Sequence, residues 1–155
     1  MKKVRLEMVE KENRMDFFKY LLLADESEEV VKQYVYDGDM FSIHYENRIA
    51  GVVLFTLHQN QVVELKNIGL DRNFRGSGIG KIVLLEAYEK YAGMHKMVVG
   101  TANSSIGNLA FYQKAGFRII GVKKDFFLHY PQPIFENGIR AMDMVMFEKE
   151  LKLGE

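Results

Sequence analysis

The stretch DRNFRGSGIGK (Asp71–Lys81) has glycine at three of five consecutive positions, 76 to 80. It follows a β-rich segment, QVVELKNIGL (Gln61–Leu70), and leads into IGKIVLLEAYEKYAG (Ile79–Gly93), whose apolar residues recur at helical spacing. A strand, a glycine-rich loop and a helix N-terminus in this order expose backbone N–H groups that bind anions. We therefore interpret the stretch as an anion-binding loop, although a glycine-rich turn that only begins a helix would have the same sequence features.

Two familiar phosphate-binding motifs do not fit this loop. A Walker A loop would need glycine at position 75 and serine or threonine at position 82, where the chain has Arg75 and Ile82. A dinucleotide-binding fingerprint would need glycine at position 81, where the chain has Lys81. The sequence therefore argues against both classes of nucleotide-binding protein.

The segments before the loop predict a β-α-α-β-β-β order. VRLEMV (Val4–Val9) alternates like a strand, a helix is expected over Arg14–Ala24 with Asn13 as its N-cap, and Ser27 should cap a second helix. Three β-rich segments with short connections then predict an antiparallel meander over residues 40–46, 48–57 and 61–70.

The segments after the loop predict α-β-α-β-β. The helix that starts at Ile79 is followed by a short buried strand, HKMVVGT, and by a second helix within NSSIGNLAFYQKAGF, capped by Asn103 or Ser104 and ended by Gly116. Strands over 117–124 and 139–151 close the chain, with the loop Asp125–Gly138 between them. We expect one α/β (α+β) domain over residues 1–155, with a mixed, mostly antiparallel sheet and one parallel strand–helix–strand crossover.

Composition excludes several other classes. The 21 basic and 21 acidic residues cancel, which argues against a nucleic-acid partner. The start is charged and no run of about 18 apolar residues occurs, so we expect neither a signal peptide nor a membrane partner. The chain has no cysteine, which fits a reducing, cytoplasmic setting, and its four histidines lack helical pairing, so no metal site is expected.

Three motifs together resemble a known family. RGSGIG (Arg75–Gly80) is similar to the Arg/Gln-x-x-Gly-x-Gly/Ala signature of the GNAT N-acetyltransferase superfamily. ELKNIGL (Glu64–Leu70) looks like that family's fourth strand, and NLAFYQKAGF (Asn108–Phe117) like its later Asn…Tyr…Gly-Phe helix. The predicted element order is also the family's order, so the resemblance covers nearly the whole chain and implies an acetyl-coenzyme A site.

The resemblance implies how that cofactor would be held. The pyrophosphate would lie on the amides of the glycine loop, Asn108 would contact the pantetheine arm, and backbone groups of Ile68 and Leu70 would meet the acetyl carbonyl and the pantetheine amides. The family usually has a bulge here that separates this strand from the next, and Gly69 suits one. The candidate cofactor-binding residues are Ile68, Gly69, Leu70, Arg75, Gly76, Ser77, Gly78, Ile79, Gly80, Lys81, Asn103, Asn108 and Tyr112.

Glu64 is the candidate general base. At pH 7 the neutral form of a lysine-like amine lies about 4.6 kcal/mol above its protonated form, so a general base would favour the reaction. Strand alternation places Glu64 on the same face as Ile68, and burial would raise its pKa toward the useful range. The alternative is a strand carboxylate that is satisfied or exposed at an edge, and both interpretations carry equal weight.

Tyr112 is the candidate proton donor to the leaving thiolate, and the Ile68 N–H is the candidate donor to the oxyanion. Asn108 and Tyr112 lie four residues apart on one helix and therefore share a face. A tyrosine pKa of about 10 against about 8.5 for a thiol makes full proton transfer uphill by roughly 2 kcal/mol, so Tyr112 could act as a hydrogen-bond donor alone. The alternative for Tyr112 is a packing role.

The sequence therefore predicts an acetyl-CoA-dependent N-acetyltransferase. Without cysteine, direct attack by the amine in a ternary complex is the simplest route. The acceptor would be a primary amine of a small molecule or a peptide, bound by Arg14–Tyr36 and Asp125–Gly138. The alternative function is a catalytically inactive acyl-CoA-binding sensor or scaffold. The resemblance also implies a homodimer, since members of this family often form one.

Overall fold

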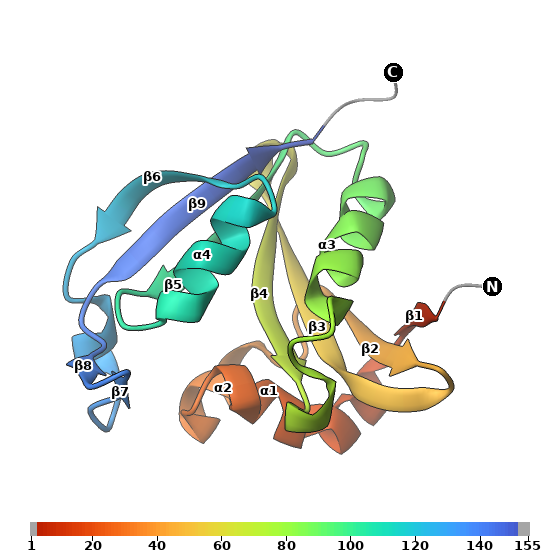
Figure 1. The fold of residues 1–155 in the computed structure, drawn as a ribbon, viewed down its shortest axis with the longest axis horizontal. Helices are drawn as coiled ribbons and strands as arrows, with labels where there is room; N and C mark the ends of the chain where they lie inside the picture. Colours follow the sequence, from red (N-terminus) through yellow and green to blue (C-terminus); the bar gives the residue numbers. More distant parts are fainter. Residues whose placement is uncertain (1–2, 152–155) are drawn as a thin grey trace.

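The structure is a computed structural model and describes residues 3–151. It contains a seven-stranded sheet in the order β1-β2-β3-β4-β5-β9-β6 and a separate two-stranded sheet, β7-β8 (Figure 1). The strands of the large sheet are Val4–Met8 (β1), Asp39–Tyr45 (β2), Arg48–His58 (β3), Val62–Leu70 (β4), Lys96–Ala102 (β5), Arg118–Lys123 (β6) and Met144–Glu150 (β9). The small sheet pairs Phe135–Glu136 (β7) with Ile139–Arg140 (β8).

The sheet confirms the expected topology. Every neighbouring pair of the large sheet is antiparallel except β4 and β5, which are parallel and are joined through helix α3 (Ile79–Lys90). The strand expected over residues 139–151 is wrong in its extent, because residues 141–143 interrupt it and divide it into β8 and β9. No helix within residues 3–151 is long and apolar enough to cross a membrane.

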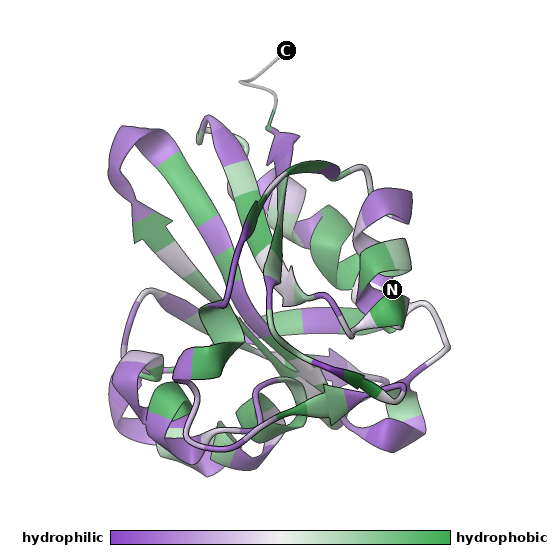
Figure 2. Cartoon of the chain, turned by 90° about the vertical axis from the view of Figure 1, so that its left-hand side faces the viewer, coloured by the Kyte–Doolittle hydropathy of each residue, from purple (hydrophilic) through white to green (hydrophobic). Residues whose placement is uncertain are grey.

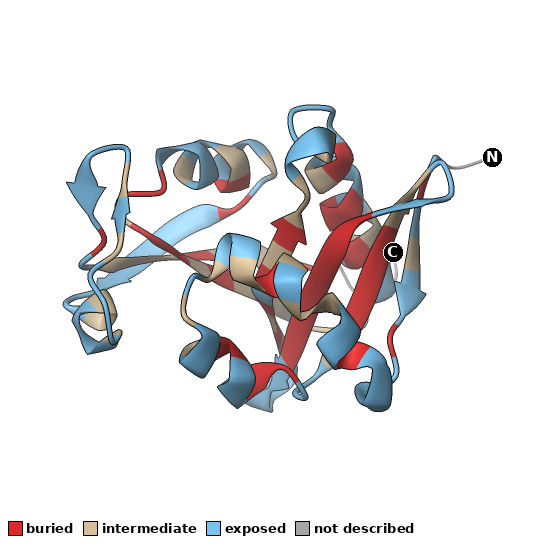
Figure 3. Ribbon diagram, turned by 90° about the horizontal axis from the view of Figure 1, so that it is seen from below, coloured by how far each residue is buried: buried red, intermediate tan, exposed pale blue. Residues whose placement is uncertain are grey.

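Helices cover both faces of the sheet. On one face, α3 and α4 (Ile106–Lys114) bury a core that includes Val53, Phe55 and Leu65. On the other face, α1 (Phe18–Ala24) and α2 (Glu28–Tyr34) pack against Val52 and Leu54. Figure 3 shows the buried residues gathered in the middle of the sheet, between the two helical layers. Along β3 the consecutive residues Ala50–Thr56 are all buried, which suits a strand that is covered on both sides. Figure 2 shows hydrophobic residues on the strands as well as on the helices that cover them.

Two of the expected helix caps are wrong. The first helical segment begins as a 3-10 helix, Lys11–Phe17, with Glu10 and not Asn13 at its cap. The cap of α4 is Ser105, without a side-chain hydrogen bond. Asn103 and Ser104 are engaged elsewhere, since the Asn103 side-chain oxygen accepts the N–H groups of residues 142 and 143 and the Ser104 hydroxyl donates to Glu136.

The other two caps are confirmed. The Ser27 hydroxyl accepts the Val30 N–H at 3.3 Å at the start of α2. Gly116 ends α4 in the left-handed conformation, with φ of 101°, and the Phe117 N–H returns to the Tyr112 carbonyl at 3.0 Å.

A β-bulge at Lys66 divides β4 into two halves. The cross-strand partners change from Phe55 with Leu65 to Leu54 with Asn67, which leaves Lys66 as the extra residue. Cross-strand partners share a face, so Leu65 lies on the α3 side whereas Asn67 lies on the α1 side.

The bulge reverses the expected relation between Glu64 and Ile68. Glu64 is paired with Thr56 and lies on the face of α1 and α2, whereas Ile68 is paired with Val53 and packs on the face of α3. The expectation that both side chains share one face is therefore wrong, because the extra residue between them shifts the alternation by one. The bulge that Gly69 suggested lies three residues earlier in the chain.

Candidate active site

The two parallel strands of the sheet separate soon after they meet. Pairing between β4 and β5 is limited to Val62–Glu64 with Lys96–Val98, and beyond it the strands diverge (Figure 1). A cavity of about 530 Å³ opens in this region, and residues of β4, β5, α4, the α1–α2 connection and the segment 126–136 line it. Four of the residues expected from the sequence meet there, namely Glu64, Ile68, Asn108 and Tyr112.

The glycine loop has the backbone of an anion cradle. Gly76 and Gly78 adopt φ values of 76° and 83°, and a Cβ at either position would find nothing within 4 Å. Gly78 caps α3, and the first helical bond runs from the Ile82 N–H to the Gly78 carbonyl. The amides that precede Ile82 therefore have no partner within the helix and face outward at the positive end of its dipole.

The remaining residues of this loop have distinct structural roles. The Arg75 Nε donates to the Leu70 carbonyl at 2.9 Å, and the Ser77 hydroxyl donates to the Phe74 carbonyl at 2.9 Å. A Cβ at Gly80 would lie 3.2 Å from the Phe111 ring, so glycine at this position allows α3 and α4 to approach each other. The loop is thus fixed to the end of β4, but its residues do not line the 530 Å³ cavity.

Gly69 and Asn103 have roles that the sequence did not indicate. A Cβ at Gly69 would collide with the Tyr20 carbonyl, so glycine allows the backbone of α1 to lie directly against β4. Asn103 donates to the Arg140 carbonyl at 3.2 Å, and its side-chain oxygen holds the chain that enters β9. Asn103 lies outside the residues that line the cavity, whereas the Asn108 amide reaches Thr101 of β5 at 3.4 Å.

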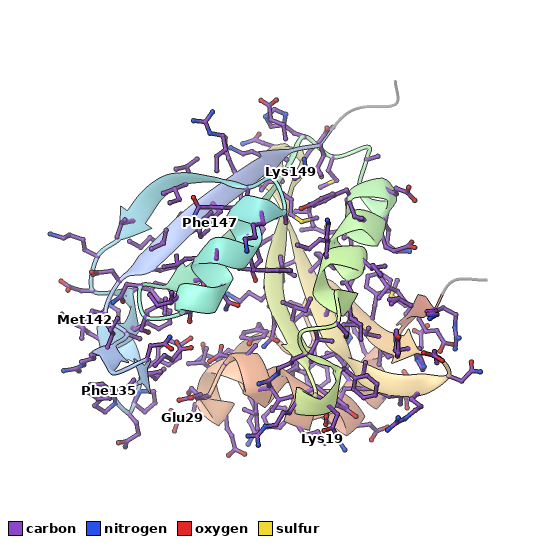
Figure 4. The ribbon with its side chains drawn as sticks, in the orientation of Figure 1. Lys19, Glu29, Phe135, Met142, Phe147 and Lys149 are labelled. Carbon is purple, nitrogen blue, oxygen red and sulfur yellow. The ribbon has the colours of Figure 1, made fainter. Side chains whose placement is uncertain are left out.

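Tyr112 belongs to an aromatic cluster beneath α4. Its ring centroid lies 5.6 Å from that of Phe117 and 5.8 Å from that of Phe147, which is labelled in Figure 4. Burial, followed by the nearby Tyr88, raises the pKa of Tyr112 well above its usual range. Tyr112 therefore keeps its proton at all pH values at which the protein would work.

Glu64 lies between two cavities. One carboxylate oxygen, Oε1, is 2.8 Å from His58 Nε2 and 3.3 Å from the Thr56 hydroxyl, and the other is 3.9 Å from Lys66 Nζ. The side chain lines the 530 Å³ cavity and also a second one of about 460 Å³ that contains His58. The Glu64 carboxylate is thus partly buried, and its contacts with His58 and Thr56 hold it in one orientation. His58 is half exposed at the end of β3, and only the register of β3 and β4 reveals its contact with Glu64.

A chain of hydrogen bonds beside the cavity was not foreseen. The Asn67 amide donates to the Leu21 carbonyl and to the Tyr34 hydroxyl, each at 2.9 Å. The hydroxyls of Tyr34 and Tyr130 reach Asp25 Oδ2 at 3.0 and 3.4 Å. Because these residues are far apart in the sequence, no motif could indicate the chain. Burial, opposed by these hydrogen bonds, raises the pKa of Asp25.

Comparisons with known proteins give a consistent result. The model of the acetyltransferase (GNAT) family matches residues 6–117. A Bacillus subtilis protein, named uncharacterized N-acetyltransferase YvbK, is 40% identical over 154 residues, which span 97% of this chain and 99% of that protein.

Two solved structures contain the cofactor or its product. A Bacillus subtilis acetyltransferase in complex with CoA is 39% identical, with a TM-score of 0.87 over 96% of this chain and 99% of that one. A GNAT family acetyltransferase from Elizabethkingia anophelis with acetyl-CoA bound is 37% identical, with a TM-score of 0.85 over 97% of this chain and 100% of that one.

Proposed function

The chain belongs to the GNAT family of acetyl-CoA-dependent acetyltransferases, and we propose that it acetylates a primary amine of a small molecule or a peptide, using Glu64, Ile68 and Tyr112. The observation that carries this proposal is the separation of β4 from β5 beyond Glu64, which brings these three residues to one cavity. The amine and the cofactor would meet there in a ternary complex, because the chain has no cysteine to carry the acetyl group.

The glycine loop fits the pyrophosphate of the cofactor. The space beside Gly76 and Gly78 is open to a ligand, and the unpaired amides at the start of α3 complement negative charge. Asn108 lies at the cavity wall, where it would meet the pantetheine arm, and Ile68 and Leu70 would offer backbone groups along β4. When bound, acetyl-CoA supplies an activated acetyl group as a thioester.

Glu64 would take the proton of the attacking amine. Its carboxylate reaches the cavity and is held by Thr56 and His58, so one orientation is favoured before the substrate arrives. A base at this position offsets part of the roughly 4.6 kcal/mol that separates a lysine-like ammonium from its neutral form at pH 7.

Ile68 and Tyr112 would stabilise negative charge. The Ile68 N–H is a fixed backbone donor on the half of β4 that lies beyond the last residue paired with β5. The raised pKa of Tyr112 makes full proton transfer to a thiolate less favourable than the sequence suggested, which favours a hydrogen bond from a neutral hydroxyl.

The experiment is a thiol-release assay. Purified protein is incubated with acetyl-CoA and a panel of amines, and free thiol is followed together with thermal stabilisation by the cofactor. Acetylation of at least one amine is expected. Stabilisation by acetyl-CoA without turnover on any amine would favour a sensor or scaffold, and no stabilisation at all would contradict the cofactor site.

We also propose a cytoplasmic homodimer. A chain without cysteine suits a reducing compartment. The edge strand β6 exposes all six of its residues, and three of them are apolar and more than half exposed: Ile119, Ile120 and Val122. An exposed apolar edge strand is a template for pairing with another chain, which supports this proposal. Sedimentation equilibrium of the wild type and of an Ile120→Lys variant tests the dimer, which the charge should weaken.

A further inference from the structure

We infer that Asp25 and Asn67 bind the acceptor amine as a cation, and that the acceptor class is a primary amine on an apolar, aromatic body without a carboxylate. This inference rests on the proposed function, because it assigns the second substrate of the same cavity. Both residues line that cavity, together with Glu64.

The hydrogen-bond chain fixes which groups remain free to bind a ligand. The Leu21 carbonyl can only accept, so the Asn67 amide nitrogen must face it, and the second N–H of that nitrogen goes to the Tyr34 oxygen. The Tyr34 hydroxyl then has its own proton to donate to Asp25. Both N–H groups of Asn67 and the Tyr34 hydroxyl proton are therefore engaged, and the groups left over are acceptors.

Asn67 Oδ1 is one of these free acceptors. It is buried and has no hydrogen-bond partner within residues 3–151, in a side chain that is 5% exposed. An unpaired buried amide oxygen costs about 1–3 kcal/mol, and a donor that arrives with a ligand would recover that cost. Asn67 lines the cavity, so a ligand N–H or O–H group that displaces the atoms covering this oxygen would satisfy it.

Asp25 is the second acceptor, and its environment favours a cation over a neutral donor. It accepts from the two tyrosine hydroxyls and from the Ser27 N–H at 3.4 Å, and Lys66 is the positive group that acts on it at longer range. Desolvation raises the pKa of Asp25, and a bound ammonium would lower it again.

The composition of the cavity wall narrows the acceptor further. Its charged residues are mainly acidic: Asp25, Glu26, Glu64 and Glu136, against Lys66 and His129. The described wall contains no arginine, so a carboxylate on the acceptor would have no bidentate partner. Phe126, Phe127 and Tyr130 form a cluster with ring centroids 5.0–6.4 Å apart, which suits a flat apolar body.

Tyr130 also connects the wall to the acceptor contacts. It lies in the segment between β6 and β7 and reaches Asp25 across 105 positions of sequence. This bond holds the aromatic cluster and Asp25 in one arrangement. An arylalkylamine could therefore place its ring on the aromatic cluster and its nitrogen near Asp25.

The test compares 2-phenylethylamine with phenylalanine, which adds a carboxylate, for the wild type and an Asp25→Asn variant. Calorimetry measures amine binding to the CoA-loaded protein, and steady-state kinetics separates KM from kcat. The matched control is Glu29→Gln on α2, an exposed acid outside the cavity wall that is labelled in Figure 4.

The expected result is a preference for 2-phenylethylamine and a KM that rises about 10- to 100-fold in Asp25→Asn, with kcat within a few-fold of the wild type and no change in Glu29→Gln. Equal use of phenylalanine, or an unchanged KM in Asp25→Asn, would overturn the inference. Amine binding that Asp25→Asn abolishes, without any acetylation, would uphold this site and contradict the proposed function instead.

The thermal stability of Asp25→Asn separates an effect on amine binding from an effect on folding. Since the pKa of Asp25 is raised in the folded state, the folded protein holds this proton longer as the pH rises through the window above 3.8. The unfolding free energy therefore falls through that window and is lower at neutral pH. Asp25→Asn removes this penalty but replaces one acceptor oxygen by an NH2 group that faces a donor, so we expect its Tm at pH 7 to stay close to that of the wild type. A large drop in Tm would assign Asp25 a structural role and contradict the inference.

Discussion

His58 Nε2 lies 2.8 Å from Glu64 Oε1, across the antiparallel pair of β3 and β4. His58 is half exposed and lines the second cavity, whereas Glu64 lines both cavities. The half-exposed imidazole connects the Glu64 carboxylate to the second cavity, and we predict that a proton taken up by Glu64 reaches solvent through His58. The other polar groups around the second cavity are Lys11, Tyr34, Tyr36, Asp37, Thr56 and Lys66.

This contact predicts different outcomes for the two residues. Glu64→Gln removes the base and should lower kcat by about 100-fold or more at unchanged affinity for acetyl-CoA. His58→Gln keeps Glu64 but loses the imidazole contact and this proton route, so a smaller loss of kcat is expected. An unchanged kcat in His58→Gln would contradict the proton route through this imidazole.

The backbone of the glycine loop predicts a binding defect without a folding defect. Gly78→Val forces a branched residue into φ of 83° and fills the open side of the loop, so affinity for CoA should be lost. The matched control is Gly93→Ala, where an added Cβ would also meet nothing within 4 Å but no left-handed conformation is imposed. Calorimetry with CoA measures both. Near-normal affinity in Gly78→Val would place the pyrophosphate elsewhere.

The sequence predicted the architecture well, for physical reasons that can be named. The β-rich segments and short connections of the meander, the apolar spacing of α3 and the Gly116 stop are local signals, and each is confirmed. The parallel pair follows from a strand–helix–strand order, which leaves few other topologies.

The details of the site could not be predicted in the same way. The alternation of ELKNIGL breaks at the polar pair Lys66–Asn67, which is where the bulge lies, but a single break in polarity does not show which face Glu64 occupies. The bonds among Asp25, Tyr34 and Tyr130 join segments that only the folded chain brings together. Local periodicity contains no information about such long-range partners.

The buried hydroxyl of Tyr112 predicts a loss of rate and a change in alkaline stability. Tyr112→Phe should lower kcat about 10-fold or more while affinity for CoA stays near that of the wild type. Because its folded-state pKa is raised above 10, Tyr112 contributes stability that is complete below pH 10 and is lost as the pH rises toward the folded value.

The loss of stability at alkaline pH gives this prediction a control. Burial also raises the pKa of Tyr88, to about 12, so the wild type should lose stability between pH 10 and 12 through both residues. Unfolding in urea at pH 8 and pH 11 measures the effect, and Tyr112→Phe should lose less between the two values than the wild type. An unchanged kcat in Tyr112→Phe would reduce this residue to packing.

Arg14 predicts the largest stability effect outside the site. The sequence suggested an ordinary helical residue, but the side chain is 3% exposed. Its guanidinium donates to the carbonyls of Val35 at 3.0 Å, Asp37 at 2.7 Å and Gly38 at 2.7 Å, and so joins the end of α2 to the start of β2. It thereby fixes the segment that follows α2, the helix that ends at Tyr34.

Arg14→Met should therefore destabilise the fold by about 3–5 kcal/mol. Methionine supplies the apolar part of the arginine side chain, but the buried carbonyls lose their hydrogen-bond donors. Arg14→Lys should recover only part of that loss, since one ammonium group cannot reproduce the planar set of donors of the guanidinium. Lys19→Met, at an exposed position labelled in Figure 4, is the surface control and should change stability by less than about 0.5 kcal/mol. Urea unfolding curves measure all three variants, and a loss in Arg14→Met no larger than in Lys19→Met would show that water replaces the guanidinium at little cost.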